Sequence, residues 1–454
     1  MGFRIEHDSM GEIQVPEEHF WGAQTQRSLE NFCIGTETIP KEVINAFAVL
    51  KSAAATANKK LGKLDSDKAR AIEAACKDIL DNKYQDEFPL KVWQTGSGTQ
   101  SNMNVNEVIA HIVNTEHPEI TIHPNDHVNM SQSSNDTFPS AMNMAAVIMI
   151  HEKLIPAIDE LIATMKHLEN ENYDVIKIGR THLQDAVPLR FSQEISGWRG
   201  MLEESRKQIV EAANHLRKIA IGGTAVGTGL NCPEGFDKLC CEEITRLTNQ
   251  SFEPSDNKFH ALTSKDGYVY TSGALKGLAA NLMKIANDIR WLANGPRCGL
   301  GEITIPENEP GSSIMPGKVN PTQCEAITMI AIQVMGNDAT IGIGASQGNF
   351  ELNVFMPVLA YNMIQSIRLL SDGINSFNKN CVSGIKAKRD KMESNLNNSL
   401  MLVTCLSPVI GYENAAACAH KAYVEDKTLK EAVLELGYLT EAEYDETVRP
   451  EKMI

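Results

Sequence analysis

Apolar residues recur at spacings of three and four along several long stretches of this chain, the pattern of helices that bury one face. The stretches are residues 137–171, 192–220, 262–294, 321–342 and 350–380. Each is longer than the mean of about a dozen residues for helices in globular proteins. Small residues are frequent within them and let neighbouring helices approach closely. The pattern predicts a mainly α protein with a central bundle of long helices, buried against other bundles in an oligomer.

The two ends of the chain have a different pattern. Residues up to about 132 mix short helical stretches, turns and extended pieces such as residues 11–16, and the segments near the C-terminus are short and more charged. We therefore predict three domains: a mixed, mostly helical domain over residues 1–132, a long-helix bundle over 133–389 and a small helical domain over 390–454.

The chain is acidic. It has 42 Lys and Arg against 58 Asp and Glu, a net charge of −16 over 454 residues. Such a surface argues against nucleic acid or an anionic membrane as a partner, because both bind concentrated positive charge. An anionic substrate would need a site that is locally positive or rich in N–H donors.

Targeting and membrane signals are not found in the sequence. The most apolar stretches, such as residues 141–150 and 326–335, have about half the length of a transmembrane helix. The N-terminal residues carry neither an apolar signal core nor an Arg- and Ser-rich transit pattern. We expect a cytoplasmic protein, or a mitochondrial one only if a transit peptide has been removed.

Metals and cofactors are not indicated. The ten cysteines are scattered, without Cys-x-x-Cys or the Cys/His spacing of zinc sites. Cys240 and Cys241 lie in a helical pattern and are best explained as reduced structural thiols. The glycine-rich run 222–229 lacks the spacing of a dinucleotide fingerprint. We expect no cofactor and no metal.

Residues 311–321, GSSIMPGKVNP, stand out most clearly. Glycine and proline at this density exclude a regular helix or strand and predict a loop with a specified backbone path. A lysine, hydroxyls and free backbone N–H groups in one loop suit a small anion. A phosphate-binding P-loop is excluded, because five residues rather than four separate the glycines and Val319 follows the lysine.

Two other polar segments precede predicted helices. Residues 95–104 alternate glycine with hydroxyl and amide side chains, and residues 123–136 end in Ser133-Ser134-Asn135 before a helix that begins near Asp136. Helix N-termini with such side chains suit a carboxylate or a phosphate. A structural cap explains part of each segment: residues 95–104 could form an elaborate N-cap, and Asp136 could cap its helix. His123 and His127 lack a third ligand for a metal.

A third segment, residues 179–188, contains His182 between Thr181 and Gln184. Histidine is suited to general acid–base catalysis because its pKa lies near the working pH. A single histidine is more often a structural residue, so these residues alone leave both functions open.

Taken together, the four segments resemble the signature regions of class II fumarases, and the likeness runs over nearly the whole chain. The pattern Gly-Ser-Ser-x-Met-Pro at residues 311–316 marks the fumarase/aspartase superfamily, and Gly317-Lys-Val-Asn-Pro321 narrows it to the fumarase/aspartase branch. Thr181-His182 and the run 95–100, TGSGTQ, are of the fumarase type. The resemblance implies a three-domain fumarase/aspartase-like fold and a homotetramer cored by the long helices, with active sites shared by three subunits.

The resemblance also implies a reaction, the reversible hydration of fumarate to (S)-malate in the tricarboxylic acid cycle. Its main task is to stabilise a doubly charged aci-carboxylate intermediate. By resemblance, Ser312 is the base, acting as an alkoxide supported by loop N–H groups and Lys318. His182 protonates the departing hydroxyl, directly or through a water, and Glu325 assists that histidine.

The resemblance assigns further residues to binding. Those expected to hold the substrate carboxylates are Ser97, Gly98, Thr99, Ser133, Ser134, Asn135, Thr181, Ser313, Val319 and Asn320. His123, Pro124, Asn125 and Asp126 match a second, peripheral dicarboxylate site of the family.

Other functions remain to be weighed against fumarate hydration. An ammonia lyase acting on aspartate would be favoured by Gln in place of His182. A catalytically silent structural tetramer would not need Ser312, Lys318 and Asn320, all of which are intact.

Three positions depart from the family pattern: Met130 and Met356 stand where lysine is frequent, and Asn143 where histidine is common. None of them matches a catalytic position, so we expect activity to persist. The variant Met130→Lys should therefore show nearly the same kcat/KM as the unmodified protein in steady-state kinetics. A large gain in kcat/KM would mean that the missing cation matters to substrate binding.

Overall fold

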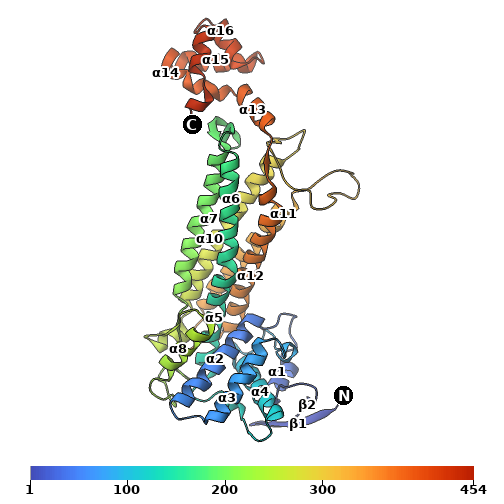
Figure 1. Cartoon of the computed structure of the whole chain (residues 1–454), viewed down its shortest axis with the longest axis vertical. Helices are drawn as coiled ribbons and strands as arrows, with labels where there is room; N and C mark the ends of the chain where they lie inside the picture. The colour runs from blue at the N-terminus through green and yellow to red at the C-terminus, as the bar shows by residue number, and fades with distance from the viewer. Residues whose placement is uncertain (1) are drawn as a thin grey trace. The chain divides into compact units, whose positions relative to one another are not determined.

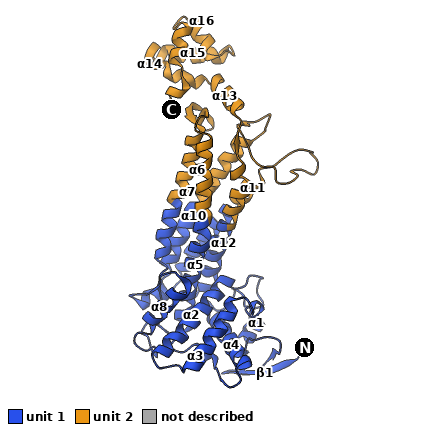
Figure 2. Ribbon diagram, viewed as in Figure 1, with its two compact units in different colours: residues 1–156, 205–279, 330–371 blue, residues 157–204, 280–329, 372–454 orange. Residues whose placement is uncertain are grey.

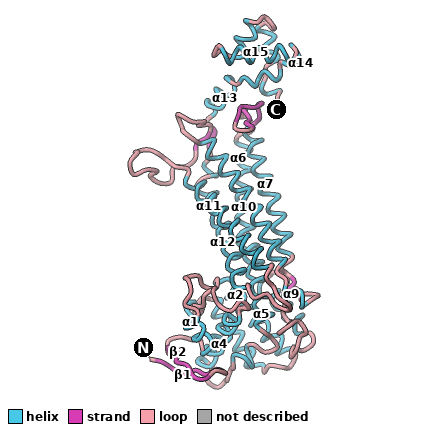
Figure 3. The backbone as a smooth tube through the Cα atoms, turned by 180° about the vertical axis from the view of Figure 1, so that it is seen from behind, coloured by secondary structure: helices cyan, strands magenta, loops and turns pink. Residues whose placement is uncertain are grey.

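The computed structural model describes residues 2–454 and is mainly α, as predicted (Figure 1). Strands are short and pair only two at a time within these residues (Figure 3). The antiparallel pairs are β1 (Phe3–Asp8) with β2 (Gly11–Pro16), β3 (Ile176–Thr181) with β4 (Gln184–Arg190), and β7 (Ile303–Thr304) with β8 (Lys386–Ala387), and the parallel pair is β5 (Lys218–Ile219) with β6 (Glu253–Pro254).

The long helices predicted from the apolar pattern are confirmed, with bounds shifted by a few residues. They are α7 (Phe191–Asn214), α10 (Asp266–Ala293), α11 (Thr322–Ala345) and α12 (Met356–Asn380), and the predicted stretch 137–171 is the continuous run of α5 (Ser134–Met149), η3 (Ile150–Leu154) and α6 (Ile155–Glu171). The turn η3 is a π-helix that ends at Leu154, two residues before Pro156. Proline lacks the N–H that an α-helix needs, and a π-turn accommodates that loss without ending the helix.

The chain divides into two compact units, coloured blue and orange in Figure 2. Unit 1 holds the described part of Met1–Pro156 with Ser205–Ala279 and Ile330–Ser371, and unit 2 holds Ala157–Glu204, Ala280–Met329 and Asp372–Ile454. The unit boundaries fall within the long helices. The three-domain division remains a prediction.

Unit 1 is built around α2 (Lys41–Lys60), which packs against α3 (Ser66–Leu80), α5 and α8 (Phe236–Thr248). Alanine is common in α2, and it favours helix formation and close packing of neighbours. Acidic Glu42 in the first turn and Lys59 and Lys60 in the last turn complement the helix dipole. The remaining helices of this unit are α1 (Ala23–Asn31), η1 (Gln85–Glu87), α4 (Thr99–Glu116), η2 (Pro124–Val128) and α9 (Lys258–Thr263).

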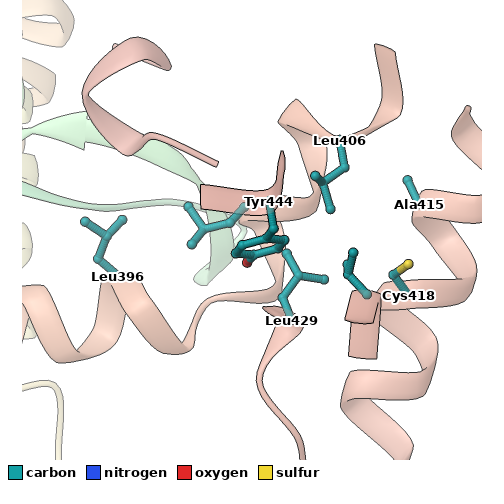
Figure 4. Close-up of a cluster of buried hydrophobic side chains, with 8 residues drawn as sticks. Leu396, Leu406, Ala415, Cys418, Leu429 and Tyr444 are labelled. Atoms are coloured by element: carbon teal, nitrogen blue, oxygen red, sulfur yellow. The ribbon is translucent and has the colours of Figure 1, made fainter. Parts of the chain in front are cut away.

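Unit 2 ends in short helices with a core of their own. They are α13 (Arg389–Asn398), η5 (Leu400–Cys405), α14 (Ser407–Ile410), α15 (Tyr412–Val424), α16 (Leu429–Glu435), α17 (Glu441–Thr447) and η6 (Pro450–Lys452). Leu406, Leu429 and Tyr444 converge in the buried cluster shown in Figure 4. Capping boxes at Thr428 and Thr440 begin α16 and α17 and make such short helices possible.

Two helices in residues 2–454, Ser134–Glu171 and Thr322–Ala345, are long and apolar enough to cross a membrane by length and composition alone. The expectation that no stretch reaches that length is therefore wrong for these two. In the first helix, 67% of the apolar window is buried, as in a core helix; in the second, 28% is buried. The apolar surface of α11 thus remains largely uncovered.

Candidate active site

In unit 1, the segment before α4 places two hydroxyls at the start of that helix. The Oγ of Ser97 and the Oγ1 of Thr99 lie 2.9 Å apart. Gly98 between them has φ of 74°, and a Cβ there would lie 2.0 Å from the Phe138 ring, so this position requires glycine. The N-cap of α4 is Gly98, which makes no side-chain cap hydrogen bond. The Oε1 of Gln94 accepts hydrogen bonds from the N–H and the hydroxyl of Ser101 in the first turn, at 3.2 and 2.9 Å. The hydroxyls of Ser97 and Thr99 are not used in these bonds, and such a pair at a helix start suits an anion.

The second segment of unit 1 begins α5. Ser133 is the N-cap and accepts a hydrogen bond from the Asn135 N–H at 3.2 Å. Asp136 is not the cap, as the sequence suggested; it completes a capping box by accepting the Ser133 N–H at 2.9 Å. Its second oxygen accepts the N–H groups of Gly222 and Thr224 at 3.0 and 2.9 Å. Burial raises the pKa of Asp136 to about 6, although these N–H donors oppose that shift.

Thr181 and His182, which have the fumarase pattern, lie in unit 2 at the tip of the β3–β4 hairpin. Thr181 pairs with Gln184, so His182 and Leu183 form the turn, with φ of 55° and 59°. Both central residues of such a tight turn need positive φ, which is uncommon for residues other than glycine. Thr181 and His182 are exposed there. The backbone thus projects the histidine into solvent at some conformational cost, a pattern associated with function.

A buried carboxylate anchors this hairpin. Glu302 is fully buried and accepts two hydrogen bonds from the Arg180 guanidinium, at 2.7 and 3.1 Å, next to Thr181. The Nζ of Lys177 lies 3.2 Å from the same carboxylate, and Asn395 donates to it at 2.9 Å. Burial raises the pKa of Glu302, but the Arg180 hydrogen bonds and the Lys177 charge outweigh it and bring the pKa below its usual value.

The loop 311–320 of unit 2 is held by contacts between its own residues. The Oγ of Ser312 accepts the N–H groups of Ile314 and Met315, at 3.3 and 3.0 Å. The Asn320 side chain donates to the Gly311 carbonyl and joins the two ends of the loop. A Cβ at Gly311 would lie 2.0 Å from the carbonyl oxygen of Lys318, so this close approach requires glycine.

Lys318, Val319 and Asn320 line a cavity of about 710 Å³ in unit 2, together with Arg290 and Trp291. Ser313 and Lys318 are exposed. Glu325 is exposed in the first turn of α11, close in sequence to the loop.

The predicted residues are thus partly assembled. Unit 1 carries Ser97, Gly98, Thr99, Ser133, Ser134 and Asn135, and unit 2 carries Thr181, His182, Ser312, Ser313, Lys318, Val319, Asn320 and Glu325. Asn102 of α4 donates to Ser134 Oγ at 3.2 Å and so links the two segments of unit 1. Within the described residues of unit 2, Ser312 is hydrogen-bonded by its own loop, and no hydrogen bond joins it to His182.

The predicted second site forms the turn at η2. Nδ1 of His123 accepts the N–H groups of Asn125 and Asp126, at 3.3 and 3.2 Å. The neighbouring His127 lies 2.9 Å from the Nζ of Lys68, and burial together with that positive charge lowers the pKa of His127. In residues 2–454, no group of three or more His, Cys, Asp or Glu side chains is arranged to hold a metal ion.

The departures from the family pattern have different surroundings. Met356 is fully buried. Met130 is half-buried, and its carbonyl accepts hydrogen bonds from Asn58 and Gln132 at 3.0 and 2.9 Å. Asn143 lines a cavity of about 800 Å³ in unit 1.

Known proteins resemble this chain over its whole length. The sequence model of the family described as "Lyase" matches residues 11–336, and that of "Fumarase C C-terminus" matches residues 402–454. The proteins named "Fumarate hydratase class II" of Bacillus subtilis (strain 168) and Campylobacter jejuni are 62% and 60% identical to it, over 100% of this chain and 99% of each relative.

Solved structures agree. The crystal structure of recombinant class II fumarase from Schistosoma mansoni has a TM-score of 0.97 and 43% identity, covering 100% of this chain and 99% of that one. A fumarate lyase:delta crystallin from Brucella melitensis, bound to cobalt, has a TM-score of 0.95 and 39% identity over the same shares.

The Glu302 anchor can be tested by Glu302→Gln, which keeps the shape of the side chain and removes its charge. Leaving the buried Lys177 and the largely buried Arg180 without this carboxylate should lower the free energy of unfolding by about 3–5 kcal/mol. Urea unfolding measures this loss. Asp174→Asn, which breaks an exposed pair with Arg389, is the matched control and should change stability little. Equal effects of the two variants would contradict the anchoring role.

Proposed function

The chain belongs to the class II fumarase family of lyases, and on this premise we propose that it catalyses the reversible hydration of fumarate to (S)-malate. The observation that carries the proposal is the 62% identity to the fumarate hydratase of Bacillus subtilis along the whole chain. In addition, residues 95–100 and Thr181-His182 have the pattern of fumarases rather than of aspartases. The class of reaction is carbon–oxygen lysis without a redox change. Such a reaction needs acid–base groups and anion donors, which the candidate residues supply.

In the direction of dehydration, Ser312 takes the proton from the carbon beside one carboxylate of malate. The electron pair left on carbon moves into that carboxylate and gives the aci-carboxylate intermediate. A neutral serine is too weak a base, so the group that acts is the alkoxide. The N–H groups of Ile314 and Met315 point at Ser312 Oγ and would stabilise its negative charge.

The intermediate then expels the hydroxyl from the neighbouring carbon. His182 supplies the proton, directly or through a water, so that the hydroxyl leaves as water and the double bond of fumarate forms. Glu325 assists that histidine. Hydration follows the same steps in reverse, and Ser312 and His182 exchange protons with solvent between turnovers.

Neutral donors hold the two substrate carboxylates in this proposal. The hydroxyls of Ser97 and Thr99, the start of α5 and the Asn320 amide surround them, with Lys318 as the cation. This donor set resolves the conflict between a dianionic substrate and a net charge of −16. The turn at residues 123–126 is proposed as a second dicarboxylate site.

We also propose a homotetramer whose active sites are shared by three subunits. An uncharged face of α11 supports association, since Met329, Ile332 and Ile343 are 65%, 63% and 67% exposed and lie on one side of the helix. Gly336 and Ala339, also exposed, lie between them and allow close helix packing. The proposed location of the enzyme is the cytoplasm.

Ultraviolet absorbance tests the activity directly, because the conjugated double bond of fumarate absorbs and neither malate nor aspartate does so comparably. Purified protein should produce a rising absorbance with malate and none with aspartate. A rise with aspartate alone would indicate an ammonia lyase, and no rise with either would indicate a structural protein.

The role of Ser312 is tested by Ser312→Ala. Loss of the base should lower kcat by about 100-fold or more, while light scattering shows an unchanged oligomer. Ser313→Ala is the matched neighbour and should act mainly on KM, because Ser313 is proposed to bind substrate. Full activity of Ser312→Ala would refute the base assignment.

A further inference from the structure

Lys51 lies in the middle of α2 and is fully buried in unit 1. Its Nζ donates to three amide oxygens: Asn102 Oδ1 at 2.7 Å, Asn129 Oδ1 at 3.0 Å and Gln132 Oε1 at 3.0 Å. An ammonium has three N–H donors, so all of them are used. The described residues place no carboxylate within ion-pair distance of this lysine. Burying an ammonium among neutral oxygens is costly, so filling space alone does not account for a lysine at this position.

The three acceptors belong to the segments that carry the proposed substrate donors. Asn102 lies one turn after Thr99 in α4, and its Nδ2 donates to Ser134 Oγ at 3.2 Å. Asn129 and Gln132 lie between η2 and Ser133. The Asn129 side chain also donates to the Gln132 carbonyl at 3.2 Å. A single side chain, that of Asn102, therefore connects Lys51 to Ser134.

The ammonium fixes the orientation of these amides. An Asn or Gln side chain can present either its oxygen or its NH₂ group. An ammonium only donates hydrogen bonds, so it pairs only with the oxygen. With their oxygens held toward Lys51, Asn102 must direct its NH₂ group at Ser134, and Gln132 must direct its own at the carbonyls of Val128 and Met130. Without the cation, Asn102 could rotate by half a turn and present an acceptor to Ser134.

We propose that Lys51 is a positioning residue for the fumarate hydratase reaction, which orients Asn102, Asn129 and Gln132 and through them sets the Ser133–Asn135 donors for a substrate carboxylate. The inference rests on the proposed function. It assigns to Lys51 no contact with substrate.

The protonation state of Lys51 supports this role. Burial lowers its pKa to about 7, opposed by the charge of Asp136. The other titratable groups that act on it are the thiols of Cys76 and Cys240, whose own pKa values burial raises, so they remain neutral. Above neutral pH the amine has two N–H donors for three oxygens. We therefore expect KM to rise with pH above about 7, in step with this pKa.

The test compares Lys51→Met with Lys265→Met. Lys265 is the matched control: it is 5% exposed in the same unit and donates to three backbone carbonyls, those of Ala261, Leu262 and Ser264, each at 3.0 Å. Both variants should lose stability. Lys51→Met alone should raise KM about 10-fold or more, the weakening expected if the misoriented donors lose about one hydrogen bond to the substrate carboxylate, with a much smaller change in kcat. The rise of KM with pH should also disappear in Lys51→Met.

Binding of succinate, a saturated dicarboxylate, is measured by calorimetry on the same oligomers and should weaken by the same factor as KM. Unchanged KM and succinate affinity in folded Lys51→Met would overturn the proposal, as would an equal rise of KM in Lys265→Met. If Lys51→Met does not fold, Asn102→Ala cuts the link to Ser134 and leaves Lys51 two acceptors; an unchanged KM in that variant would also overturn it. Absence of turnover in the unmodified protein would refute the proposed function instead.

Discussion

A dianionic substrate and a protein of net charge −16 repel each other, so binding depends on donors concentrated at one place. This constraint explains the composition of all the candidate segments. They use hydroxyls, amides and backbone N–H groups, which attract an anion without a cluster of cations. Backbone donors become available only where the chain turns sharply, so Gly98 and Gly311 are needed where a Cβ would collide with a neighbour. Gly98 and Gly311 therefore support the proposed binding indirectly, by permitting the backbone path of their segments.

Buried charges hold these donor segments in place, and they do so in two different ways. Asp136 and Glu302 are buried carboxylates satisfied by N–H donors, and each connects the start of a functional segment to distant parts of its own unit. Lys51 is the reverse case, a buried cation satisfied by amide oxygens. In each case, removing the charge leaves its partners unsatisfied, so the geometry of the segment is strongly specified. Rigid donors suit a reaction in which the developing charge must meet dipoles that are already oriented.

The sequence was sufficient for the long helices and for the loops and helix starts that carry the candidate residues, because both depend on local patterns. Periodicity located the long helices to within a few residues, and glycine, proline and polar clusters located the loops. The buried anchors Glu302 and Lys51 were missed because their contacts join residues that are far apart in the sequence. Glu302 meets Arg180 across more than a hundred residues of chain, and no local pattern indicates that pairing. Lys51 did leave a signal, since it lies three and four residues from the buried Ala48 and Phe47, on the face of α2 that the apolar pattern predicts to be buried. A lysine at such a position needs polar partners, but their identity depends on tertiary structure.

The candidate residues fall into two groups by solvent exposure, and the difference is relevant to the association of subunits. Ser97 and Gly98 are buried and Ser133 to Asn135 are half-buried, whereas Thr181, His182 and Lys318 are exposed. In the proposed mechanism, electrostatic stabilisation of the aci-carboxylate is strong only where water is excluded, so the exposed His182 and Lys318 lack the environment that their proposed roles need. The apolar face of α11 is also exposed, and association of subunits would cover it. If the same association also excludes water from His182 and Lys318, activity requires assembly. The hydrophobic effect that drives the oligomer would then also create the low-dielectric site in which a few neutral donors are strong enough to hold the intermediate.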